Sequence, residues 1–505
     1  MPCAARGVEE YRLHETTASA QRWVSRRGRG TNERDERSFR GRGRSMGRTR
    51  NVKLAAVIAQ AGLSQARLAT RVRSVAAEHG VSELAGVGQS HIAKWVGGVV
   101  PEPPGARILA ETLSRSLGRL VTLADIGLTA DTDELELPAW SDDPLTTLVT
   151  LGSKDMVDID RRHLLATSAY SVAALALPGD QYFESAVDRA RARKPLSSYV
   201  VTAQDVDDVR EMTAIFSRRD QKRGGRAGRA ALVAYLRTDV AELLSGRFLS
   251  EDIRRSMTSA AAELAYLAGW TAFDGREHPL AQRWLTIATG LAEEAGDAPL
   301  AGHILRAMAH QAVDLGQPQE AVRLAEASLS TRRYAHACWR ERSLLGVVHA
   351  RGLAAAGEKK AAAAALLRAE QDLGRAGDED DEPNRVFFYT EASLAHETAA
   401  ALRDMGDLKG AETQFHRSVR TRRAQFVRTH SVTLGYLGAV QAQQGHLDSA
   451  CETWGQALDA MTGVQSGRAK ETVVQMRRAL SPFRNRAGSQ AAELDARARA
   501  MLHTS

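Results

Sequence analysis

Two short stretches, LSQARLA at residues 63–69 and GQSHIAKWVGG at residues 88–98, decide how the N-terminal part of this chain is expected to fold. In each stretch, apolar residues recur at the spacing of an amphipathic helix. The second stretch would bury three residues on one side of a short helix, namely Ile92, Trp95 and Val96. The sequence therefore predicts two packed helices, the second ended by its paired glycines.

The polar residues of these stretches are candidate contacts to double-stranded DNA. Those on the outward face of the second helix carry hydrogen-bonding groups that suit base edges in a major groove. Those in the first turn of the first helix, which begins at a capping serine, suit phosphates and would fix the register. The predicted DNA-contacting residues are Ser64, Gln65, Arg67, Gln89, Ser90, His91 and Lys94.

Residues 51–128 resemble the Xre/Cro-type helix-turn-helix family on the residues just quoted. Ser64 and Ser90, which open the two helices, lie about twice as far apart as is usual in that family. The segment 71–88 is therefore expected to be an extended helix plus a loop. A small helical bundle that touches no nucleic acid is the alternative interpretation of the same residues.

Two further patterns complete this predicted domain. Residues 106–117 are expected to form a helix beneath the DNA-reading pair, and Thr122 to Asp125 show a capping-box pattern that predicts the start of another helix. Residues 51–128 hold eight basic and five acidic residues, a modest surplus for a phosphate-binding surface.

Composition favours an all-α chain of several domains without catalytic or metal sites. The chain has 505 residues, and only 5% are aromatic, while alanine is abundant. Its three cysteines are far apart in the sequence, and its histidines show no metal-ligand spacing, so we expect no cofactor, no metal and no enzyme activity. Unpaired cysteines are typical of a reducing cytoplasm.

All of the net positive charge, +7, comes from residues 1–50, which contain 13 arginines and six acidic residues. This segment has no apolar periodicity and is predicted to be a disordered basic leader. It could grip DNA phosphates, or the native chain could begin at Met46, just before the helical pattern.

The middle of the chain is predicted to contain an acidic linker at residues 129–149 and a helical connecting region at residues 150–260. An apolar run between Arg161 and Leu177 is too short to span a bilayer and is expected to be a buried helix. No membrane association is expected.

The second strong pattern is a repeat in residues 261–465. A turn glycine followed by an alanine five residues later recurs, with a looser copy at Gly275 and four regular copies at Gly316, Gly357, Gly406 and Gly445. These residues resemble the tetratricopeptide repeat family, which implies an α-solenoid whose groove binds a protein or peptide partner. Residues 466–505 would form a C-terminal helical tail.

The combination of both patterns is similar to large actinobacterial regulators that pair an Xre-like head with tetratricopeptide repeats, among them streptomycete negative regulators of development and antibiotic production. That resemblance implies an N-terminal helix-turn-helix bundle, a C-terminal solenoid, and a cytoplasmic, nucleoid-associated repressor that binds double-stranded DNA. A homodimer is expected because one head reads few base pairs. The alternative is a tetratricopeptide interaction scaffold without specific DNA binding.

Overall fold

The computed structural model describes residues 49–504 with internal gaps at 79–80, 118–120, 124, 129–139, 141, 157–169, 378–381 and 482–487. Nearly all of the predicted basic leader, residues 1–48, lies outside the described residues. Helices dominate the remainder, as expected for an all-α chain, and the only strands among the described residues are the two-residue parallel pair β1 (Val200–Val201) and β2 (Arg247–Phe248).

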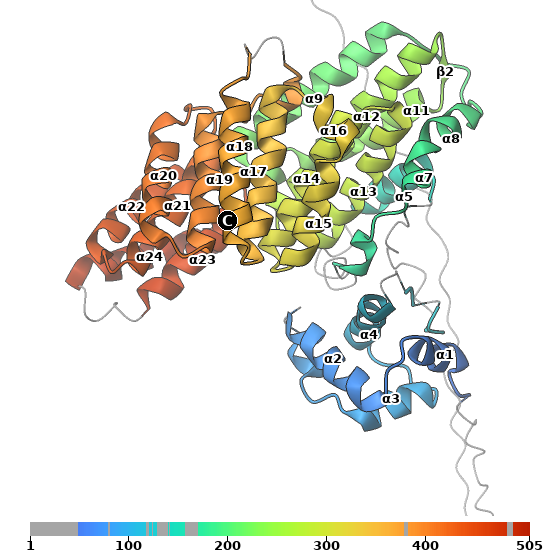
Figure 1. The fold of residues 1–505 in the computed structure, drawn as a ribbon, viewed down its shortest axis with the longest axis horizontal. Helices are drawn as coiled ribbons and strands as arrows, with labels where there is room; N and C mark the ends of the chain where they lie inside the picture. Colours follow the sequence, from blue (N-terminus) through green and yellow to red (C-terminus); the bar gives the residue numbers. More distant parts are fainter. Residues whose placement is uncertain are drawn as a thin grey trace, which may run out of the picture. The chain divides into compact units, whose positions relative to one another are not determined.

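Residues 49–128 form a helical head with its own apolar core (Figure 1). Its elements are α1 (Val52–Gln60), α2 (Gln65–Glu78), a 3-10 helix (Ser82–Leu84), α3 (Gln89–Val96) and α4 (Pro103–Leu117). The core runs in sequence from Leu54 to Leu128 and includes Trp95 of α3. A long α2 followed by a loop was predicted and is confirmed. Helix α4 begins earlier than expected because proline is tolerated in a first helical turn.

The capping-box pattern at Thr122 forms its hydrogen bonds but does not start a helix. The backbone N–H of Thr122 donates to the Asp125 carboxylate at 2.9 Å, and the N–H of Asp125 donates to the Thr122 hydroxyl at 3.1 Å. The chain then turns at Gly127, where φ is +66°, a left-handed conformation that glycine adopts without strain. The prediction of a further helix here is therefore wrong within the described residues.

The connecting region is helical and begins inside the segment predicted as a linker. Its helices are α5 (Pro144–Met156), α7 (Asp180–Glu184), α8 (Ala186–Ala192), α9 (Ala203–Arg223), α10 (Arg229–Tyr235) and α11 (Ala241–Leu244), with a π-helix at Leu236–Val240 and a 3-10 helix at Gly225–Ala227. Of the apolar run expected to be a buried helix, only the part from Tyr170 onward is described. It contains a 3-10 helix at Ala173–Leu175 and no α-helix.

Residues 251–504 form stacked helix pairs, which include the repeat predicted at residues 261–465 (Figure 1). The helices are α12 (Glu251–Asp274), α13 (His278–Ala295), α14 (Ala298–Asp314), α15 (Pro318–Ser328), α16 (Thr331–Ala335), α17 (Trp339–Ala355), α18 (Lys359–Leu373), α19 (Glu391–Asp404), α20 (Leu408–Thr421), α21 (Val427–Gln443), α22 (Leu447–Ala460), α23 (Gly467–Leu480) and α24 (Gly488–Thr504).

The turn glycines explain why the repeat is regular. Gly316, Gly357, Gly406 and Gly445 all have φ between +68° and +88°, where a side chain would be strained. At the looser copy the left-handed residue is Arg276 rather than Gly275. The alanine five residues after each turn glycine is fully buried in all four regular copies. Its small side chain lets the paired helices approach closely.

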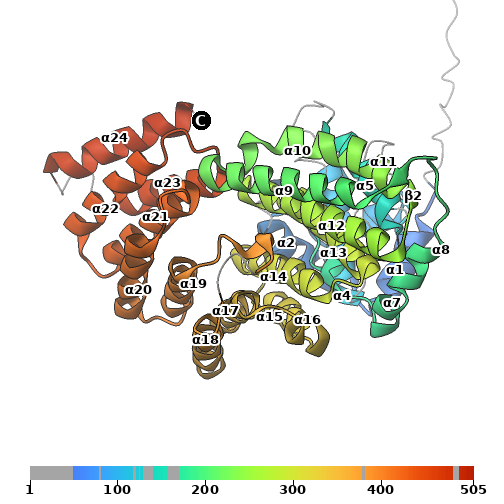
Figure 2. The ribbon, with the colours of Figure 1, turned by 90° about the horizontal axis from the view of Figure 1, so that it is seen from above.

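The last repeats contact the first ones through elements that precede the solenoid. Helix α9 packs against both α12 and α21, and α21 packs against α23 (Figure 2). The backbone N–H of Gln465 donates to the carbonyl of Arg223 at 2.7 Å, and the N–H of Arg226 donates to the carbonyl of Gln465 at 3.3 Å. A Cβ on Gly224 would lie 2.5 Å from that same Gln465 oxygen, so glycine is needed for the approach.

Buried charges reinforce this contact. Arg428 on α21 donates to Asp274 of α12 at 3.1 Å and to Asp220 of α9 at 3.0 Å, and all three side chains are almost completely buried. Asp274 also accepts from the Ser466 hydroxyl at 3.0 Å. We call this contact between residues 220–275 and 428–468 the closure of the solenoid.

None of the described helices has the length and apolar character needed to cross a membrane. Among the described residues there is also no group of histidine, cysteine or acidic side chains that could hold a metal ion.

Candidate nucleic-acid interface

Helix α3 is divided into a buried side and an exposed side as the sequence predicts. Ile92, Trp95 and Val96 are buried in the head core, and Trp95 lies against the start of α4, where a Cβ on Gly105 would be 4.0 Å from its ring. The predicted base-contacting residues are all exposed on the opposite side: Gln89, Ser90, His91 and Lys94. The helix contains no acidic residue, so this face would not repel phosphates.

His91 has a local structural role that the sequence did not reveal. Its Nδ1 accepts a hydrogen bond from the backbone N–H of Gly88 at 3.2 Å, which satisfies one of the unpaired N–H groups at the start of α3. With Nδ1 as acceptor, the neutral ring carries its proton on Nε2. The outward nitrogen is therefore a donor, which suits an acceptor on a base or phosphate.

The three remaining predicted contacts lie at the start of α2. The Ser64 hydroxyl accepts from the backbone N–H of Arg67 at 3.3 Å, so the predicted capping role is confirmed. Ser64 and Arg67 are exposed, whereas Gln65 is half-buried. Helices α2 and α3 pack directly against each other through their apolar sides, so the two groups of predicted contacts belong to one small domain.

Arg73 fixes the long connection between these helices. Its guanidinium donates to the carbonyl of Val87 at 2.6 Å, just before α3 begins, and to the Thr70 hydroxyl at 3.2 Å. Val87 is buried in the head core. Although the connection between α2 and α3 is unusually long, the contact with Arg73 fixes the position where α3 begins. This role of Arg73 could not be predicted, because no local sequence pattern distinguishes it from the other basic residues of the head.

Several of the basic residues counted in the head are committed to internal contacts. Besides Arg73, Arg71 donates to the Ser116 hydroxyl at 2.8 Å, and Arg115 pairs with the buried Glu111 at 2.8 Å. The charge of Arg115 is balanced by Glu111, whereas Arg71 and Arg73 keep their charge but are held in place by neutral partners. Arg67 and Lys94 remain exposed on α2 and α3.

Comparison with known proteins covers the same part of the chain. Residues 54–129 match the family described as the SP15 N-terminal domain. The matched range coincides with the core of the head, which runs from Leu54 to Leu128. The head is thus similar to that domain, while residues 130–505 lie outside the match. A comparison with curated proteins finds no significant match to the chain.

Proposed function

We propose that the protein is a DNA-binding transcriptional regulator in which α3 reads base edges and the start of α2 contacts phosphates. The observation that carries the proposal is the exposed face of α3, where Gln89, Ser90, His91 and Lys94 stand together on a helix whose other side is locked into a core. These side chains can donate to and accept from base edges in a major groove. Exposed Arg67 adds a cation at the neighbouring helix start.

The resemblance to actinobacterial helix-turn-helix regulators with tetratricopeptide repeats supports the finer part of this proposal. It suggests a repressor of developmental or secondary-metabolism genes that acts in the cytoplasm on the nucleoid. A homodimer would place two heads on a two-fold symmetric site. The stacked helix pairs of residues 251–504 offer the surface on which a protein or peptide partner would control DNA occupancy.

Selection of bound genomic fragments with the full chain tests the proposal. The wild type should enrich fragments that share a recurrent motif, and the double variant Gln89→Ala/Lys94→Ala should lose that enrichment. A matched control is Lys360→Ala/Gln371→Ala, which removes the same two residue types from the exposed surface of α18. No shared motif, or a motif that the reading-face variant still enriches, would contradict DNA reading by α3.

A tetratricopeptide-like interaction scaffold without specific DNA binding is the second candidate. The scaffold interpretation is favoured by the internal contacts of three polar residues of the head, because these contacts stabilise the fold and need no DNA. The residues are His91, which caps its own helix, and Arg71 and Arg73, which bond to groups within the head. In that case, fragment recovery by the wild type would fall to the background of an unrelated DNA sequence at physiological salt.

A further inference from the structure

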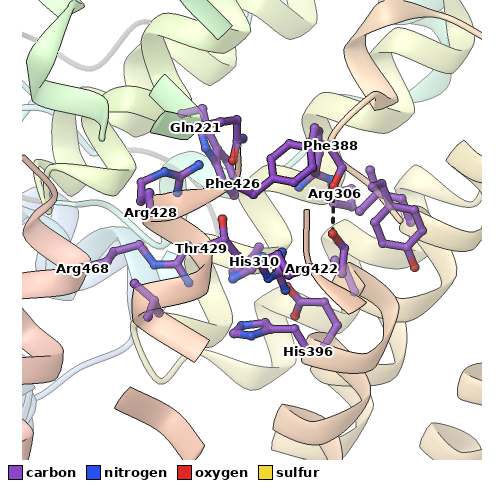
Figure 3. A pocket seen from close by; sticks show the side chains of 17 residues that line it. Gln221, Arg306, His310, Phe388, His396, Arg422, Phe426, Arg428, Thr429 and Arg468 are labelled. Atoms are coloured by element: carbon purple, nitrogen blue, oxygen red, sulfur yellow. Dashed lines mark hydrogen bonds and ion pairs between the residues drawn. The ribbon is translucent and has the colours of Figure 1, made fainter. Parts of the chain in front are cut away.

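A cavity lies where α9, α12, α14, α17, α19, α21 and α23 converge (Figure 3). The cavity has a volume of about 60 Å³. That volume exceeds the roughly 10–15 Å³ that a single water requires. That space suits a compact ligand and is too small for an extended peptide.

The side chains that line this cavity are strongly basic. Four arginines face one acidic residue, Glu397, and the four are Arg306, Arg422, Arg428 and Arg468. Glu397 is already engaged, because it accepts from Arg351 at 2.9 Å. In Figure 3, Arg428 and Arg468 extend from one side of the cavity, and Arg306, His310 and Arg422 lie on the other.

Each of the four lining arginines has a hydrogen-bond donor for which the described part of the chain provides no acceptor. The Nε atoms of Arg306, Arg422, Arg428 and Arg468 are all buried without a partner among the described residues. Such a donor loses its hydrogen bond to water without replacement, which is costly for a charged group. Buried polar groups in proteins are nearly always hydrogen-bonded, so four unpaired donors around one small cavity are unusual.

The four arginines differ in how well their charge is balanced. Arg428 is held between Asp220 and Asp274, whereas Arg468 only approaches Asp314, at 3.9 Å. Arg306 is bonded only to neutral partners: it donates to the Tyr266 hydroxyl at 3.0 Å and contacts the ring of His303 at 2.9 Å.

Arg422 likewise has only neutral partners, since it donates to the carbonyl of Ala392 at 3.0 Å and to the Ser418 hydroxyl at 2.8 Å. Within the described part of the chain, neither Arg306 nor Arg422 has a carboxylate at ion-pair distance. Burial lowers the pKa of Arg422 to about 10, so it stays protonated at neutral pH. Burial also holds the pKa values of His310 and His396 well below their usual range, so both lining histidines are neutral there.

We propose that this cavity binds a small phosphate-bearing anion, held chiefly by Arg306, Arg422 and Arg468. A phosphate group offers several acceptor oxygens pointing in different directions, which matches donors that come from α14, the end of α20 and α23. Charge-assisted hydrogen bonds from guanidinium to phosphate are among the stronger ones in proteins. The binding would also tie the closure to the middle repeats, because the three arginines belong to separate helix pairs. The inference does not depend on DNA reading by the head.

Isothermal titration calorimetry of the full chain with inorganic phosphate, pyrophosphate and citrate, at constant ionic strength, tests this inference. We expect saturable 1:1 binding of phosphate or pyrophosphate and a dissociation constant at least tenfold higher in Arg468→Met. The control Arg332→Met removes an exposed arginine of α16 and should leave the constant unchanged. Arg422→Met provides a second variant if Arg468→Met does not fold.

Three results of the titration would contradict the inference. No saturable heat with either phosphate probe in the wild type would overturn the inference, as would equal binding by the wild type and both cavity variants. Binding of citrate alone would replace phosphate with a carboxylate ligand and would also contradict it. Because the titration uses no DNA, its failure leaves the proposed function of the head to be judged by fragment selection.

Discussion

Replacing Arg428 with methionine should open the closure of the solenoid. The substitution keeps an unbranched side chain of similar reach but removes the charge that faces Asp220 and Asp274. Both carboxylates are almost fully buried, with side-chain exposures of 2% and 0%. Removing one partner from a buried ion pair typically costs about 3–5 kcal/mol, because the remaining charge is left uncompensated. We expect a loss of that size at the closure.

Hydrogen exchange followed by mass spectrometry measures this loss locally, at the amides that cross the closure. The informative amides are those of Gln465 and Arg226, whose hydrogen bonds cross the closure. A loss of about 3 kcal/mol or more corresponds to at least about 100-fold faster exchange, since each 1.4 kcal/mol is a factor of ten. The effect should shrink when the pH is lowered from 8 to 5, because burial raises the pKa of Asp220 to about 6 and its protonated carboxyl group no longer requires a cation.

Arg417→Met is the matched control. Arg417 pairs with Glu391 at 2.8 Å, but the two side chains are 41% and 52% exposed. An exposed pair contributes about 0–1 kcal/mol, so this variant should exchange nearly as the wild type does. If Arg428→Met and Arg417→Met alter exchange at the closure equally little, buried charge does not hold the closure and the reasoning is refuted.

Three further substitutions test packing and titration. Gly438→Ala should destabilise the solenoid by about 1–3 kcal/mol, because the new Cβ would lie 2.5 Å from the indole nitrogen of Trp454. Gly455→Ala in α22 is the control, because the nearest atom to its Cβ would be 3.9 Å away, and it should be neutral or stabilise by up to about 1 kcal/mol. Thermal unfolding midpoints measure both effects. Burial raises the pKa of Asp220 to about 6 despite the neighbouring Arg428. The folded protein therefore binds a proton at Asp220 more tightly than the unfolded chain does. The contribution of Asp220 to the free energy of unfolding should fall by up to about 3 kcal/mol as the pH rises from about 4 through about 6. Denaturant titrations over that range should show a weaker decline in Asp220→Asn, and an identical decline in both proteins would contradict this assignment.

The head and the repeats were predictable because their signals are local. Helix α3 could be divided into a buried and an exposed side because Ile92, Trp95 and Val96 lie within one short helical period. The repeat turns were visible because a left-handed residue is most often glycine, as at Gly357 and Gly406.

The closure and the cavity were not predictable because their partners are distant in sequence. Arg428 lies 208 residues from Asp220 and 154 residues from Asp274, and nothing near any of them marks a partner. The backbone around Gly224 packs against Gln465, which is also far away in the sequence. The helix predicted after Thr122 was wrong for the opposite reason. The local capping pattern was present and forms its hydrogen bonds, but the chain turns at Gly127.

Base reading by α3, as we propose it, is tested by comparing the affinities of the wild type and Gln89→Ala for the selected DNA site and for each of its single base-pair variants. Gln89→Ala should lose about 1–3 kcal/mol of binding free energy on the selected site and should no longer discriminate between base pairs at one position, while discrimination at the other positions is retained. A uniform loss of affinity across all variants, or no loss at all, would contradict base reading by this helix.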